Sequence, residues 1–106
     1  MEKYVINYPK RINEFEIKAQ LYNELREKGI DVRGEVKAYK CRFDLVVFQN
    51  RKAICIIEVK SWKRLKKPKR TKQLMKYLKF KLPLIYCTQH SEISNTVNEV
   101  ESLLNK

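Results

Sequence analysis

Three charged residues lie in segments that otherwise resemble buried strands, and their side chains could hold a divalent cation and contact an anion. Asp44 is surrounded by Phe, Leu and Val residues, and Glu58 and Lys60 follow the apolar run at 54–57. Because side chains alternate along a strand, Glu58 and Lys60 point to the same face. Unpaired charges cost several kcal/mol to bury, so we expect a chain that keeps them at such positions to use them.

The strand that carries Asp44 is expected to pair with the strand that carries Glu58. If Gln49 pairs with Ala53 across a three-residue loop, Asp44 lies directly opposite Glu58, with Cβ atoms about 5 Å apart. Two carboxylates that close repel each other unless a cation lies between them. Oxygen ligands suit Mg²⁺ or Mn²⁺. A loop with an even number of residues would instead place Asp44 on the opposite face and remove this prediction.

A plainer interpretation of the same residues stays open. Charged side chains at a strand end usually form the exposed rim of a sheet. Asp44 could cap a turn, and Lys60 could simply pair with Glu58. An acid-x-lysine pattern is short and occurs by chance in many proteins, so the surrounding elements must decide between the two interpretations.

Apolar periodicity predicts one domain over residues 1–106 with the element order α-β-β-β-α-β-α. The expected elements are a helix at 13–28, strands at 32–39, 42–48 and 53–60, a helix at 69–81, a strand at 84–88, and a last helix that Ser91 or Ser94 caps. This order predicts an α/β domain of the mixed α+β kind, with helices on both faces of a central mixed sheet.

The first helix offers two glutamates with different expected roles. Asn13 and Glu16 form a capping box, which assigns Glu16 to the helix end. Ile17, Leu21 and Leu25 recur at helical spacing and mark the face that meets the sheet. Glu14 falls within the angular range of that face, so it is the glutamate expected to face the sheet; a first-turn acid placed only by the helix dipole is the alternative.

Asp44, followed after thirteen intervening residues by Glu58-Val59-Lys60, resembles the PD-(D/E)XK nuclease superfamily. The resemblance includes the leading helix with a glutamate, the element order, and a glutamine in the second helix. Phe43 stands where that family often has a proline. The size and layout are similar to those of Holliday-junction resolvases, small phage-type nuclease domains and homing endonucleases. The resemblance implies a restriction-endonuclease-like fold.

The resemblance also implies roles for individual residues. The metal ligands would be Asp44, Glu58 and the backbone carbonyl of Val59, with Glu14 bound directly or through water. Lys60 would orient or activate the attacking water. Two further residues are implied at the border of the active site, Gln73 as a catalytic residue and Tyr77 one turn later; both could equally be polar residues at the edge of the core. The expected cofactor is Mg²⁺ or Mn²⁺.

A long basic segment accounts for much of the net charge of +12. Eleven Lys and Arg residues and no acidic residue lie between Glu58 and Glu92. Such a run is often a solvated face, but uncompensated charges repel each other and favour a polyanionic partner. The residues expected to contact DNA are Lys63, Arg64, Lys66, Lys67, Lys69, Arg70, Lys72, Lys76 and Tyr77. Trp62 could stack on a base, although closing the core is its more ordinary role.

The cysteines and the apolar runs indicate the compartment. Cys41, Cys55 and Cys87 are odd in number, form no CxxC pair and share the chain with a single histidine, which favours free core thiols over zinc or disulfides. No run resembles a signal peptide or a membrane span, so we expect an intracellular, cytoplasmic protein.

These observations together predict a metal-dependent DNA endonuclease. A homodimer and an RNA substrate both stay open. The alternative is a non-catalytic nucleic-acid-binding module on a degenerate nuclease fold. A peripheral membrane protein fits least well, since no helix pairs a basic face with a broad exposed apolar one.

Overall fold

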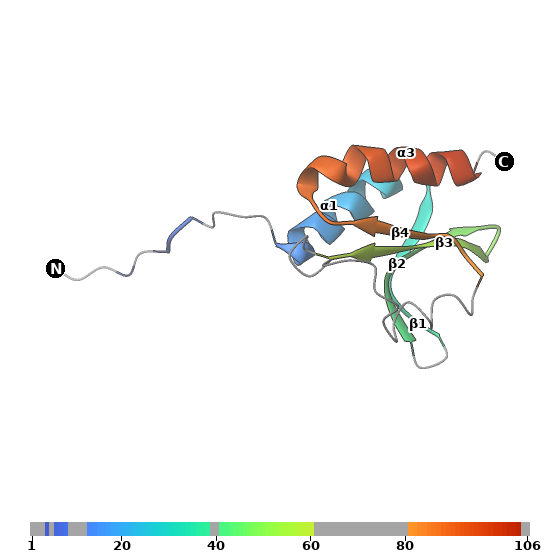
Figure 1. Ribbon diagram of the computed structural model, residues 1–106, viewed down its shortest axis with the longest axis horizontal. Helices are drawn as coiled ribbons and strands as arrows, with labels where there is room; N and C mark the ends of the chain where they lie inside the picture. Colours follow the sequence, from blue (N-terminus) through green and yellow to red (C-terminus); the bar gives the residue numbers. More distant parts are fainter. Residues whose placement is uncertain (1–3, 5, 9–12, 39–40, 61–80, 105–106) are drawn as a thin grey trace.

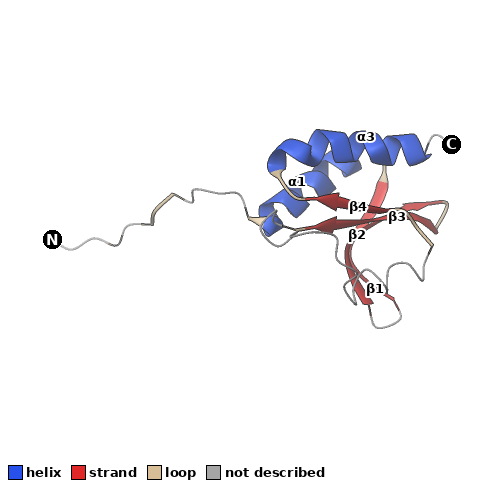
Figure 2. Cartoon of the chain, in the orientation of Figure 1, coloured by secondary structure: helices blue, strands red, loops and turns tan. Residues whose placement is uncertain are grey.

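Four strands form one mixed sheet, and two helices lie along one of its faces (Figures 1 and 2). The computed structural model describes residues 4, 6–8, 13–38, 41–60 and 81–104. Its elements are α1 (Glu14–Glu27), β1 (Asp31–Ala38), β2 (Cys41–Gln49), β3 (Lys52–Val59), β4 (Leu84–Cys87), the 3₁₀ turn η1 (His90–Glu92) and α3 (Ile93–Leu104). The predicted mixed class is confirmed for this part of the chain.

The helix α1 forms as its sequence predicts. Asn13 accepts a hydrogen bond from the Glu16 N–H at 2.8 Å, and the Glu16 carboxylate accepts one from the Asn13 N–H at 2.9 Å. This capping box satisfies two N–H groups that the first turn would leave unpaired. The helix ends before Gly29, whose φ of 78° continues no helix. The apolar stripe Ile17, Leu21 and Leu25 is buried.

The sheet has the order β1-β2-β3-β4, with antiparallel pairing of the first three strands and parallel pairing of β3 with β4. A parallel pair needs a long crossover connection, which residues 60–83 supply. The helix expected at 69–81 lies outside the described residues except for Lys81, which is a turn residue with φ of 54°. Both described helices cover the same face, so the expectation of helices on both faces is met on one face only among these elements.

The turn between β2 and β3 differs from the prediction. The loop has two residues, Asn50 and Arg51, so Gln49 pairs with Lys52 and the expected pairing with Ala53 is wrong. Both loop residues have positive φ, 54° and 66°, which is the pattern of a type I′ turn. This turn twists in the same sense as the strands that it joins, which explains why a two-residue loop forms without glycine.

A bulge on β3 then restores the register that a two-residue loop alone would have lost. The pairing shifts by one residue between the turn and the middle of the strands, and Ile54 is the extra residue on β3. Leu45 pairs with Ile57 beyond the bulge. Continued by one step, this register brings Asp44 opposite Glu58, as the sequence predicts, although the loop that leads there is different.

Two buried clusters fill the two faces of the sheet. The larger joins the stripes of α1 and α3 to one face, and the smaller lies on the other face around Phe43 and Ile56. On β1, Val32 belongs to the first cluster and Val36 to the second, although residues four apart share a face of a regular strand. Glu35, with φ of 53°, lies between them and rotates the strand. Figure 1 shows this part of the β1–β2 hairpin bending away from β3 and β4.

The C-terminal helix begins differently from the prediction. Neither Ser91 nor Ser94 caps it; η1 precedes it, and Ser91 lies inside that turn. The Glu92 carboxylate instead accepts hydrogen bonds from the Thr88 N–H and hydroxyl, both at 2.7 Å. These bonds lower the pKa of Glu92. The carboxylate therefore fastens the 3₁₀ turn to the end of β4.

The three cysteines are free and buried, as expected of core thiols. Burial, with a smaller contribution from the charge of Glu99, raises the pKa of Cys55 to about 11. Among the helices that the structure describes, none is both long enough and apolar enough to span a membrane.

Candidate active site

The strands β2 and β3 separate where Asp44 and Glu58 lie. Their recorded pairing ends at Leu45 and Ile57. Beyond that point the Asp44 N–H donates to Glu58 Oε2 at 2.8 Å, and the Val59 N–H donates to Asp44 Oδ2 at 2.9 Å. The two carboxylates thus take the place of backbone acceptors between the strands. This cross-bonding holds both acids in fixed positions at the end of the sheet.

Glu58 is the more buried of the two acids, with 1% of its surface exposed. The Lys60 Nζ lies 3.9 Å from Glu58 Oε1 and the lysine side chain is 30% exposed, so Lys60 joins the buried acid to the surface. A hydrogen bond to a charged group contributes about 1.5–3 kcal/mol, whereas desolvating a carboxylate costs several kcal/mol. The hydrogen bond from Asp44 and the contact with Lys60 therefore offset part of the desolvation cost of Glu58.

A pocket of about 180 Å³ opens beside the cross-bonded pair. Four residues predicted from the sequence line it, namely Glu14, Asp44, Val59 and Lys60, together with Phe15 and Lys18. Glu58 does not line the pocket and is buried, with its Oε2 accepting the Asp44 N–H. The structure thus brings the predicted residues of α1, β2 and β3 to one place, with Glu58 deeper than the sequence suggested.

The two glutamates of the first helical turn have separate positions. Glu16 is exposed and occupied by the capping box. Glu14 is half-buried and lines the pocket. Glu14, and not Glu16, thus lines the pocket together with Asp44, and a role for it in the chemistry stays a prediction.

Two polar residues near the pair were not predicted. Lys18 lines the pocket one helical turn after Glu14, and this i, i+4 spacing is the signal that could have identified it. Tyr86 pairs with Glu58 in the parallel register of β3 and β4. Burial, and then the charge of Glu58, raises the pKa of Tyr86, which shows that the phenol lies within electrostatic reach of the acid.

The oxygen atoms of this site fit a hard divalent cation. Asp44 and Glu58 each accept a backbone hydrogen bond, and carboxylate oxygens are the ligands that hard cations such as Mg²⁺ prefer. No group of three or more His, Cys, Asp or Glu side chains in the described ranges could hold a metal ion, so Glu14 does not converge with the other two acids as a third direct ligand. Mg²⁺ usually takes one or two carboxylates and completes its shell with water and substrate phosphates. A two-carboxylate set therefore remains chemically suitable.

The remaining predicted site residues lie outside the described residues. They are Gln73 and the expected DNA contacts Lys63, Arg64, Lys66, Lys67, Lys69, Arg70, Lys72, Lys76 and Tyr77. Their roles stay predictions from the sequence.

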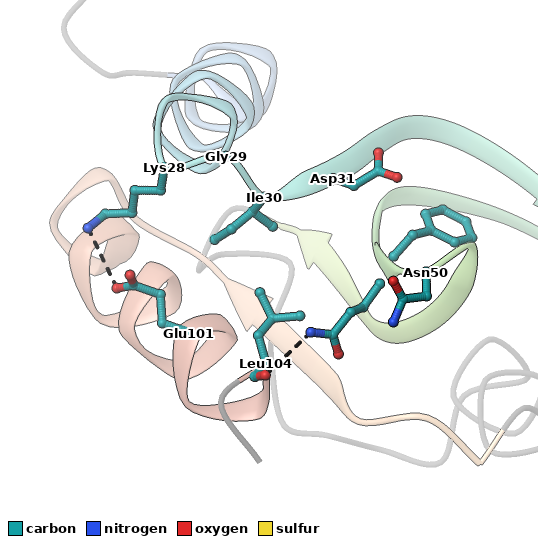
Figure 3. Close-up of a pocket in the computed structure, with 9 residues that line it drawn as sticks. Lys28, Gly29, Ile30, Asp31, Asn50, Glu101 and Leu104 are labelled. Carbon is teal, nitrogen blue, oxygen red and sulfur yellow. Dashed lines mark hydrogen bonds and ion pairs between the residues drawn. The ribbon is translucent and has the colours of Figure 1, made fainter.

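A larger pocket, of about 400 Å³, lies at the opposite end of α1 (Figure 3). Its charged groups are paired: the Lys28 Nζ lies 3.6 Å from Glu101 Oε1, and Asp31 Oδ1 lies 2.9 Å from the Arg33 Nε. The neutral Gln49 amide donates to the Leu104 carbonyl at 3.5 Å. The volume alone would favour this pocket, but it contains no carboxylate pair bonded across two strands. The smaller pocket is therefore the candidate site. No family model, curated protein or solved structure matches this chain.

Proposed function

We propose that this chain is a metal-dependent endonuclease that hydrolyses DNA phosphodiester bonds on a fold of the restriction-endonuclease type. The observation that carries the proposal is the cross-bonding of Asp44 and Glu58 beside a pocket that also contains Glu14 and Lys60. The resemblance to the PD-(D/E)XK superfamily supports it, and so does the order of the described elements.

In this proposal Asp44, Glu58 and the Val59 carbonyl hold Mg²⁺ or Mn²⁺. Such an ion would, when bound, make a water molecule more acidic and offset negative charge on the phosphate. Lys60 contacts the scissile phosphate and orients the attacking water, because its ammonium reaches from Glu58 toward the pocket. Glu14 accepts a hydrogen bond from a water in the same pocket.

The alternative, a binding module without catalysis, explains the net charge of +12 equally well. It gives no reason for a nearly inaccessible carboxylate at Glu58, which weakens attraction for DNA and costs desolvation energy. It also gives no reason for the second carboxylate bonded beside it. The pair therefore favours the enzyme.

The test is the nicking of supercoiled plasmid in Mg²⁺, in Mn²⁺ and in EDTA. The proposal expects nicking with either metal and none with EDTA. Lys60→Met should lower the rate about 10²-fold or more, as expected for losing a group that stabilises charge in the transition state. Lys52→Met, at an exposed position on the same strand, is the matched control. Plasmid that is retarded on a gel but uncut in all three conditions would instead support the binding module.

A further inference from the structure

Three charged residues form a bridged cluster next to the pocket. The Lys18 Nζ lies 2.6 Å from Glu35 Oε1, and the Arg42 Nε lies 3.8 Å from Glu35 Oε2. One carboxylate thus lies between an ammonium from α1 and a guanidinium from β2. Glu35 occupies this position with a left-handed backbone, φ 53°, which is costly for a residue with a side chain.

The cluster is adjacent to the candidate active site. Lys18 lines the pocket together with Asp44 and Lys60. Glu35 lies on β1 between the pairs Gly34–Leu45 and Val36–Phe43, and so across from Asp44. An anion between Lys18 and Arg42 would therefore sit beside the place where the scissile phosphate is expected.

The charges of the cluster are not balanced. The hydrogen bond from Lys18, and the charges of Lys18, Arg42 and Lys37, lower the pKa of Glu35, so this carboxylate is ionised at neutral pH. Within the cluster one negative charge faces two positive ones, while the carboxylates of Glu14 and Asp44 line the pocket beside Lys18. Arg and Lys are also the side chains that most often contact backbone phosphates. Two cations that share one exposed carboxylate suit an anion that competes with that carboxylate for them.

We propose that Lys18 and Arg42 bind a backbone phosphate of DNA next to the phosphate that is cut, and that Glu35 holds the place of that phosphate in the free protein. This inference rests on the proposed function, because it takes DNA as the ligand. On binding, the phosphate replaces the Glu35 carboxylate between the two cations. Glu35 thereby keeps both cations in position and opposes binding until a phosphate displaces it.

The experiment measures the affinity of the full chain for a short fluorescent DNA duplex in EDTA, which prevents cleavage, at salt concentrations from about 50 to 200 mM. Lys18→Met should weaken binding and lower the slope of log affinity against log salt by about 0.9, the value for one phosphate contact. The ratio of wild-type to variant affinity should then be about 3.5-fold larger at the low salt concentration than at the high one. Arg42→Met should act in the same direction. Glu35→Gln should tighten binding.

The matched controls come from a second ion pair of α1. Lys28 and Glu101 lie 3.6 Å apart at the opposite end of the helix, in the pocket of Figure 3. Lys28→Met and Glu101→Gln change the net charge by the same amounts as the cluster variants. They should alter the affinity only slightly and leave the salt slope unchanged.

A phosphate site predicts that Lys18→Met weakens the affinity for DNA and that Glu35→Gln raises it. A purely structural ion pair predicts that either substitution destabilises the fold in the same way. The proposal is wrong if Lys18→Met leaves the salt slope unchanged, if Lys28→Met lowers it equally, or if Glu35→Gln weakens binding. A wild-type chain that nicks plasmid while Lys18→Met keeps its slope overturns this inference alone. A wild-type chain that neither binds nor nicks DNA overturns the proposed function itself.

Discussion

Replacing Asp44 in two ways separates its part in folding from its proposed part in catalysis. The Asp44 carboxylate accepts the Val59 N–H, and Val59 is 2% exposed. Asp44→Ala leaves that buried N–H without an acceptor, which costs about 1–3 kcal/mol. For a chain of this size, about 5 °C of Tm corresponds to each kcal/mol, so we expect Tm to fall by about 5–15 °C.

Asp44→Asn keeps an acceptor at the same place. The neutral bond is weaker than the charged one by about 1 kcal/mol, but the substitution also relieves the repulsion between two neighbouring carboxylates. We therefore expect Tm to stay within about 5 °C of wild type. Both variants should lose nicking. Thermal unfolding followed by circular dichroism, beside a plasmid assay, measures both effects.

Two results would refute this reasoning. If Asp44→Ala unfolds at the wild-type temperature, the bond to Val59 does not hold the strands at this end. If Asp44→Asn unfolds as early as Asp44→Ala, charge rather than an acceptor atom fixes the site. Asp31→Asn, at a carboxylate paired with Arg33 away from the pocket, is the control and should keep both stability and nicking.

Three further predictions follow from the fold. Asn13→Ala removes the capping box and should cost about 1 kcal/mol, seen as a lower Tm, whereas Asn98→Ala on the exposed side of α3 should cost less. The pKa of Glu92 is lowered from 4.5 in the folded chain, so its contribution to stability is present above that pH and is lost as the pH falls through the folded pKa. The Tm difference between wild type and Glu92→Gln should therefore be largest near neutral pH and should narrow below about 4.5. A Tm difference that stays constant with pH would contradict this. Cys55, with a pKa raised to about 11, should resist a thiol reagent at pH 8 until denaturant is added, and fast labelling of the folded chain would show that the core is open.

The sequence predicts best where one local rule decides the structure. Asn13 and Glu16 meet at a fixed spacing, and the stripe of α1 needs only the helical period. The two acids were also found from local pattern, because charged residues inside apolar strands are costly wherever the sheet lies. Their separate depths, with Glu58 buried and Asp44 at the pocket, depend on how the strands separate, which no local pattern records.

In the β2–β3 hairpin the predicted loop length is wrong, but the register at the far end of the strands is the predicted one. The loop length was wrong, because Asn50 and Arg51 have no glycine to indicate a type I′ turn. The bulge at Ile54 then compensated the error, so the acids face each other by a route that was not foreseen. The hydrophobic pattern of the two strands constrains register more strongly than the turn does.

The residues that were missed owe their positions to tertiary structure. Glu35 reaches Lys18 only because its backbone is left-handed, and nothing in the surrounding sequence apart from the preceding Gly34 indicates that conformation. Tyr86 neighbours Glu58 only through the parallel pairing of β3 with β4, which the intervening crossover connection brings about. Composition and periodicity do not predict which residues that are distant in sequence contact each other in a site.

The central claim is that Asp44 and Glu58 form a metal-dependent hydrolytic site. The most direct test compares the initial rate of plasmid nicking by wild type and by Asp44→Asn in Mg²⁺, with DNA binding by both measured in EDTA. We predict nicking by wild type alone, with equal or tighter DNA binding by the variant because it carries one negative charge fewer. Nicking by Asp44→Asn at the wild-type rate would contradict the account.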